Sequence, residues 1–382
     1  MNYPIYLDYA ATTPLDKRVL EVMLPYFTQH FGNAGSQQHA YGWVAAEAVA
    51  TARHQVADCI GATAKEIVFT SGATEAINLA IKGVLQSSSR EKKHIITIST
   101  EHKATLEVCK SLESQGVEVS YLPVNSDGKI NKEALKNAIQ ESTILISLLW
   151  GNNETGVIHP VKDITAIAHE CNILVHVDAT QSIGKVPVSV ANLGIDLLSF
   201  SSHKIYGPKG VGALFIKKGI SVLTQQYGGG QERYLRGGTL NISGIIGFGE
   251  ACKLASEEIE DNKRIKNLRD LLEKLLQEQL LEIQINGQRN DRLSHISNIS
   301  FPGIDGEELL MRLNKVAVSN GSACNSAATE PSHVLKAMGL SDELAYASVR
   351  FSLGKFTTTE DIHTTVNHVA VVYSHIVGIF PN

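Results

Sequence analysis

The sequence lacks the features that mark several large classes of protein. Among its 382 residues are five cysteines, no two of them two residues apart, which argues against a disulfide framework and a Cys-rich metal site. It contains no basic tract and its formal net charge is −5, which argues against direct nucleic-acid binding. No apolar run approaches the roughly 20 residues needed to span a bilayer, and "MNYPIYLDYAATTP" lacks the pattern of a signal peptide. We therefore expect a cytoplasmic protein that binds neither membranes nor nucleic acids directly.

Short apolar runs alternate with helical patterns over the first two-thirds of the chain. "EIVFTS" precedes "GATEAINLAIKGVLQ", and "HIITIST" precedes "EHKATLEVCKSLESQG". Because the strand-like runs are apolar throughout, the alternation predicts an α/β fold whose mostly parallel sheet is buried on both faces.

The pattern changes after about residue 247. We expect one long amphipathic helix over residues 248–282, followed by short strands and a last helix that opens with a capping box of Thr357 and Glu360. This predicts a large domain over residues 16–247 and a smaller α+β domain formed by residues 1–15 and 248–382.

Polar side chains follow five of the predicted strands. The segments after these strands are "TSGATEA", "EHKA", "GNNETG", "DATQS" and "SSHKIYG". Because ligands of open parallel sheets bind outside the carboxyl ends of the strands, we expect the five segments to converge on one site.

Three of these segments together indicate pyridoxal 5′-phosphate (PLP). "SGATE" (Ser71 to Glu75) enters a helix and suits a phosphate, although many strand-to-helix turns look alike. Asp178 ends a very apolar strand; it is either a turn aspartate or the partner of a cationic ring nitrogen, with Gln181 near a ring oxygen. Lys204 alone would be an ordinary solvated lysine. The succession of all three at strand ends favours PLP, which needs a lysine, a carboxylate and a phosphate cradle.

Other side chains extend this hypothesis. Ser201 and His203 would donate to the phosphate, and His102 would stack on the ring and serve in proton transfer. Cys324 lies in "VSNGSACNSAATEPSH", whose small polar residues predict an exposed, flexible loop with a reactive thiol. The cysteines in helical patterns are interpreted as packed, and they are Cys59, Cys109, Cys171 and Cys252. A mobile thiol in a PLP enzyme suggests sulfur chemistry.

Over nearly its whole length the sequence resembles the cysteine desulfurases of the NifS/IscS type (group I). These belong to the class V aminotransferase superfamily of fold-type I PLP enzymes. The matching stretches include "IYLDYAATTP", "VFTSGATEAINLAIKG", "NNETG", "HVDATQSIGK", "SFSSHKIYGPKGVGAL", "GGGQERYLRGGT", "GSACNSAATEPSHVL" and "VRFSLGKFT". The resemblance implies a large domain with a mostly parallel seven-stranded sheet and a smaller C-terminal α+β domain.

The resemblance also implies roles around the cofactor ring. Lys204 forms the Schiff base with PLP, and Asp178 pairs with the pyridine nitrogen. His102 stacks on the ring. Asn153 and Gln181 contact the side of the ring that carries the hydroxyl group.

The remaining implied roles concern the phosphate, the substrate and the sulfur. The phosphate ligands within the chain are Ala73, Thr74, Ser201 and His203. Thr239 of "RGGT" reaches the phosphate of the other subunit in a homodimer, and Arg350 of "VRFSLG", with Asn153, binds the substrate carboxylate. Cys324 is the nucleophile, and His102 and Lys204 complete the catalytic set.

The implied reaction removes sulfur from L-cysteine and gives L-alanine and a persulfide on Cys324. The persulfide passes to an acceptor protein, such as an iron–sulfur scaffold, or serves thio-cofactor synthesis or tRNA thiolation. No resident metal is expected, although Cys324 would meet an iron–sulfur cluster during transfer. Two alternatives stay open. A selenocysteine lyase shares nearly every motif, and another class V PLP transaminase or lyase would use Lys204 and Asp178 without needing Cys324.

Overall fold

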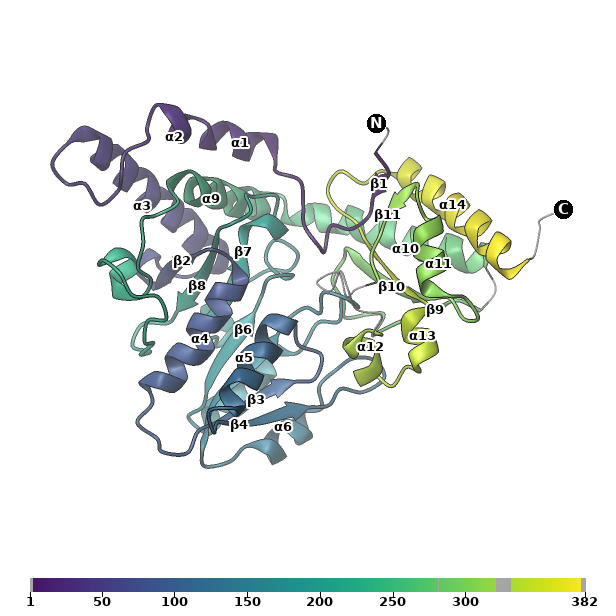
Figure 1. The fold of residues 1–382 in the computed structure, drawn as a ribbon, viewed down its shortest axis with the longest axis horizontal. Helices are drawn as coiled ribbons and strands as arrows, with labels where there is room; N and C mark the ends of the chain where they lie inside the picture. Colours follow the sequence, from purple (N-terminus) through teal and green to yellow (C-terminus); the bar gives the residue numbers. More distant parts are fainter. Residues whose placement is uncertain (1–2, 281, 321–330, 379–382) are drawn as a thin grey trace.

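The computed structural model describes residues 3–280, 282–320 and 331–378, and Figure 1 shows their arrangement. Seven strands form the central sheet in the order β2, β8, β7, β6, β5, β3, β4. Their bounds are Ile67–Thr70 (β2), Gly212–Ile216 (β8), Leu197–Ser201 (β7), Leu174–Asp178 (β6), Thr143–Leu149 (β5), His94–Ile98 (β3) and Glu118–Leu122 (β4). Only β8 runs antiparallel to its neighbours β2 and β7 in this sheet. The prediction of a mostly parallel seven-stranded sheet is confirmed.

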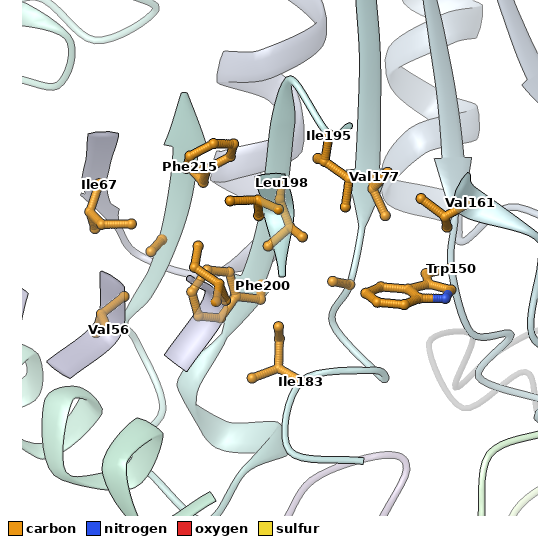
Figure 2. Close-up of a cluster of buried hydrophobic side chains, with 14 of the residues drawn as sticks. Val56, Ile67, Trp150, Val161, Val177, Ile183, Ile195, Leu198, Phe200 and Phe215 are labelled. Atoms are coloured by element: carbon orange, nitrogen blue, oxygen red, sulfur yellow. The ribbon is translucent and has the colours of Figure 1, made fainter. Parts of the chain in front are cut away.

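Helices cover both faces of the sheet, and side chains alternate between two apolar clusters. Ile67 and Phe69 belong to the cluster on one face, whereas Val68 between them belongs to the cluster on the other face. Figure 2 shows part of the first cluster, where Phe200, Phe215 and Leu198 lie close together. Burial of both faces explains why the strands are apolar at every position.

The two helical layers differ in their members. The helices on the first face are mainly α1 (Lys17–Met23), α3 (Ala40–Ile60), α7 (Val161–Glu170) and α9 (Ile242–Glu257). Those on the second face are α4 (Ala73–Ser87) and α5 (Lys103–Glu113). Short helices that connect these elements are α2 (Pro25–Thr28), α6 (Lys132–Ala138) and α8 (Val190–Leu193).

A second apolar core lies around a smaller sheet. This antiparallel sheet has the order β12 (Ser348–Ser352), β10 (Ile296–Ser300) and β9 (Gln284–Ile285). Beside it β1 (Ile5–Tyr6) pairs in parallel with β11 (Val316–Ala317), so the start of the chain joins this core through Leu7. The helices here are α10 (Asn262–Gln279), α11 (Gly306–Arg312) and α14 (Thr359–Val377), with α12 (His333–Ala337) and α13 (Asp342–Tyr346) nearby (Figure 1).

The prediction of one helix over residues 248–282 is wrong. Helix α9 ends at Glu257, a short 3₁₀ turn follows at Ile259–Asp261, and α10 begins at Asn262. The break has a packing cause: Phe248 belongs to the first core, whereas Leu268 belongs to the second. The division of the chain into domains at residues 16 and 247 stays a prediction.

Two smaller expectations also need correction. The capping box of α14 is formed by Thr358 and Asp361, because Thr357 is turned inward and its hydroxyl accepts from the Gly354 N–H at 3.0 Å. Cys171 is exposed, since it follows the last helical residue of α7, so the interpretation of this thiol as packed is wrong. Among residues 3–280, 282–320 and 331–378, no helix is both long and apolar enough to cross a membrane.

Candidate active site

A cavity of about 570 Å³ opens at the carboxyl ends of the central strands, and we call it the strand-end cavity. All five polar segments that follow strands contribute to its lining, which confirms that they converge. The predicted site residues that line it are Ala73, Thr74, His102, Asn153, Asp178, Gln181, Ser201, His203, Lys204 and Arg350. Thr239 is exposed and is not among the lining residues, and Cys324 lies outside the described residues.

Asp178 is the buried acid of the cavity, with 3% of its surface exposed at the end of β6. Its Oδ1 accepts hydrogen bonds from the Thr180 N–H at 2.9 Å and from the Thr180 hydroxyl at 2.5 Å. Burial raises the pKa of Asp178, while the bonds from Thr180 act in the opposite direction because they favour the carboxylate. Thr180 therefore holds one oxygen of the carboxylate in place.

Lys204 lies in the short 3₁₀ turn Ser202–Lys204 directly after β7. Its ammonium donates to the carbonyl of Ala10 at 2.6 Å and to that of Ala11 at 2.7 Å. The Gln181 amide donates to the same Ala10 carbonyl at 2.8 Å. The amine is thus directed toward a segment from the far N-terminal end of the chain.

The start of α4 lies at one end of the cavity and could hold an anion. The first N–H groups of a helix have no intrahelical acceptor, and Ala73 and Thr74 both line the cavity. A side chain at Gly212 would come within 2.7 Å of the Gly72 backbone, so the glycine allows the turn to lie against β8. Glu75 nearby is paired with Arg236 at 2.9 Å, which offsets its charge beside an anion.

Two histidines of the cavity have lowered pKa values. His102 caps α5, where its Nδ1 accepts from the Ala104 N–H at 3.1 Å, and burial lowers its pKa. His203 lies 3.1 Å from the Thr12 hydroxyl through Nδ1, and burial together with the charge of Lys204 lowers its pKa to about 4. A neutral imidazole can accept or donate one proton, as acid–base chemistry requires.

Arg350 lies on β12 of the smaller sheet and is 2% exposed. Its Nη1 donates to the Asn153 carbonyl at 3.0 Å, and its Nη2 contacts Asp8 Oδ1 at 2.7 Å. Its Nε has no hydrogen-bond partner within the described residues. The smaller sheet thus contributes a cation to a cavity whose other lining residues come mainly from the strand ends of the central sheet and from residues 10–12.

The residues that orient this site were not among those predicted from the sequence. Thr180 holds Asp178, Asp8 holds Arg350, and the backbone of Ala10 and Ala11 accepts from Lys204. "DATQS" placed a threonine two residues after the aspartate, the spacing of a side chain that bonds its neighbour's carboxylate. Nothing local to "IYLDYAATTP" indicates that it reaches the cavity.

The residues present fit PLP. The cavity offers an amine, a buried carboxylate, a helix start suited to phosphate and an imidazole, as the cofactor's aldehyde, ring nitrogen, phosphate and ring face require.

Comparison with known proteins agrees with this geometry. The family described as aminotransferase class-V matches residues 5–364. A curated relative named cysteine desulfurase IscS, from Anaeromyxobacter sp. (strain Fw109-5), is 50% identical over 372 residues, which cover 97% of this chain and 92% of the relative. A solved NifS-like protein superposes with a TM-score of 0.92 at 39% identity, covering 97% of this chain and 100% of that one.

A second solved structure, described as SspA in complex with cysteine, has a TM-score of 0.82 at 38% identity, and the match covers 93% of this chain and 100% of that one. The chain therefore belongs to the class-V aminotransferase family, among the PLP-dependent cysteine desulfurases of the NifS/IscS type.

Proposed function

We propose that the residues of the strand-end cavity divide the work of cysteine desulfuration among cofactor binding, substrate binding and proton transfer. The observation that supports this division is that Lys204, Asp178, the start of α4 and Arg350 all line one cavity. The reaction takes sulfur from L-cysteine and leaves L-alanine.

The residues at the strand ends of the central sheet would bind the cofactor. Asp178 would hold the protonated ring nitrogen, His102 would stack on the ring, and Asn153 and Gln181 would face its hydroxyl side. The phosphate would be held by Ala73, Thr74, Ser201 and His203. When bound, PLP supplies an electron sink that lets a proton leave the substrate Cα.

Lys204 would hold PLP through its amine and, once released from the cofactor, would move the substrate Cα proton. Its two carbonyl acceptors fix the direction of the amine, so it stays at the cavity when released from the cofactor. Arg350 would bind the substrate carboxylate, because it lines the cavity and its two hydrogen bonds leave further N–H donors of the guanidinium over.

Cys324 would take the sulfur as a thiolate. Its Sγ forms a bond to the substrate sulfur while the substrate Cβ–S bond breaks, and the electrons of that bond stay with the carbon. A proton then completes the methyl group of alanine, and Cys324 carries the persulfide. The persulfide would pass to a sulfur-acceptor protein in the cytoplasm, such as an iron–sulfur scaffold.

A homodimer would complete the site. Large aromatic side chains are exposed around α2 and the start of α3, and they are Phe27, Phe31, Tyr41 and Trp43. Tyr227 and Tyr234 are exposed on the segment that leads to Thr239. Exposed aromatic side chains of this kind suit an interface, and Thr239 of one copy would then reach the phosphate bound by the other.

Mass spectrometry after brief exposure to L-cysteine without reductant tests the assignment of Cys324. We expect one extra sulfur on the tryptic peptide that contains Cys324, and we expect Cys324→Ser to bind PLP but to release no alanine. Cys171→Ser is the matched control, because its thiol is exposed and can meet the same reagents; it should keep full alanine production. Full alanine production by Cys324→Ser, or a persulfide mainly on another cysteine, would refute the assignment.

A further inference from the structure

The N-terminal segment (residues 8–13) contacts four of the predicted site residues. Its backbone carbonyls accept from Lys204 and Gln181, and Thr12 bonds to His203. The fourth contact is the ion pair between Asp8 and Arg350. A segment from the opposite end of the chain therefore forms one wall of the site.

From this arrangement we infer that Asp8 is a positioning residue. It orients the Arg350 guanidinium so that the remaining N–H donors receive the substrate carboxylate. The inference rests on the proposed function of Arg350. It adds the N-terminal segment to substrate recognition.

The hydrogen bonds of Arg350 leave donors available for a substrate. A guanidinium carries five N–H donors in a planar fork. The Asn153 carbonyl occupies one on Nη1 and Asp8 occupies one on Nη2, while Nε has no partner within the described residues. Because Asp8 and Asn153 each accept one N–H and fix the plane of the fork, and because Arg350 lines the strand-end cavity, the remaining N–H donors can bind a carboxylate without displacing either partner.

Asp8 is itself held firmly enough to act as a guide. Its backbone forms a parallel bridge with Ser352, two residues after Arg350 on β12. Its carbonyl accepts from the Ala11 N–H at 3.0 Å and from the Tyr6 hydroxyl at 3.1 Å. The two partners of the ion pair are therefore anchored to the same strand, so the backbone fixes their relative position.

Two probes that differ only in a carboxylate test the inference. L-alanine and ethylamine share the amine and the methyl group, and neither carries sulfur, so the bound cofactor's change in absorbance reports equilibrium binding of each. The ratio of the two affinities measures carboxylate recognition alone. The holoenzyme is titrated as wild type, Asp8→Ala, Asp8→Asn and the control Asp163→Ala, whose carboxylate pairs with Lys132 on the surface.

We expect Asp8→Ala to lower the ratio about tenfold, as the loss of a hydrogen bond to a charged group implies, with ethylamine affinity unchanged within about twofold. Asp8→Asn should keep the ratio within about threefold of wild type, because its amide oxygen still accepts from Nη2. An equal loss for both probes in Asp8→Ala, or no loss for either, would overturn the inference. A ratio for Asp8→Asn as low as that for Asp8→Ala would also overturn it, since charge rather than orientation would then be the cause.

The variant Arg350→Gln separates this inference from the proposed function. If it leaves the ratio unchanged, the role of Arg350 itself is wrong. If it abolishes the preference for L-alanine while Asp8→Ala does not alter it, only the role of Asp8 is wrong.

Discussion

Removing the hydroxyl of Thr180 should change the pH at which the enzyme works. Thr180→Val keeps the branched shape and the backbone N–H but deletes the 2.5 Å hydrogen bond to Asp178 Oδ1. A hydrogen bond to an ionised group contributes about 1.5–3 kcal/mol. Since about 1.36 kcal/mol corresponds to a factor of ten between two protonation states, the protonated form of Asp178 gains tenfold or more.

The direction in which the pKa of Asp178 shifts follows from two opposing influences. Burial raises its pKa, and the bonds from Thr180 counter that rise by stabilising the carboxylate. Without the hydroxyl the pKa rises further, so the carboxylate persists only at higher pH. If the carboxylate is needed to hold the cofactor's ring nitrogen, the acidic limb of activity must move to higher pH.

The assay is the pH dependence of kcat/KM for alanine formation, which reports groups of the free enzyme. Thr180→Ser is the matched control, because it keeps both the hydroxyl and the N–H, and its acidic limb should coincide with that of the wild type. An acidic limb that does not move in Thr180→Val, with the cofactor still bound, would refute the proposed role of Asp178.

Two further predictions concern the cofactor lysine and the stability of the fold. Lys204→Ala should lose cysteine turnover while its far-ultraviolet circular dichroism stays unchanged. In the wild type, borohydride should fix PLP to the peptide that contains Lys204. Fixation of PLP elsewhere would contradict the assignment. Glu232→Ala should lower the free energy of unfolding by about 3–5 kcal/mol in a urea titration. The reason is that the buried Glu232 carboxylate accepts from Nη1 and Nη2 of Arg53 and from the Phe69 N–H. The control Lys136→Ala removes an exposed pair and should leave the free energy of unfolding almost unchanged, and equal losses in the two variants would contradict the argument.

The central sheet and the polar residues at its edge could be predicted because both depend on short, local stretches of sequence. Apolar runs such as "TILISLL" give strands buried on both faces, and the polar residues directly after them must lie at one edge. Asp178 and Lys204 were identified in this way, and the structure places both in one cavity.

Features that depend on contacts between distant segments could not be predicted in the same way. Asp8 and Arg350 are 342 residues apart, and no local pattern links them. Residues 258–261, between α9 and α10, contain no glycine or proline that would predict a break. The break occurs because α9 packs in the first core and α10 packs in the second. The capping box was misplaced by one residue, because Thr357 and Thr358 are locally equivalent until Thr357 is drawn inward by Gly354.

Two buried acids at the strand ends show how such distant contacts shape a site. The Glu101 carboxylate accepts from the Leu149 N–H at 2.6 Å, and Glu154 accepts from the Ser332 hydroxyl at 2.5 Å at the start of α12. Burial raises the pKa of both acids, because it disfavours the charged form of each carboxyl group. Local sequence thus identifies the groups that react, whereas long-range pairing sets their charge and direction.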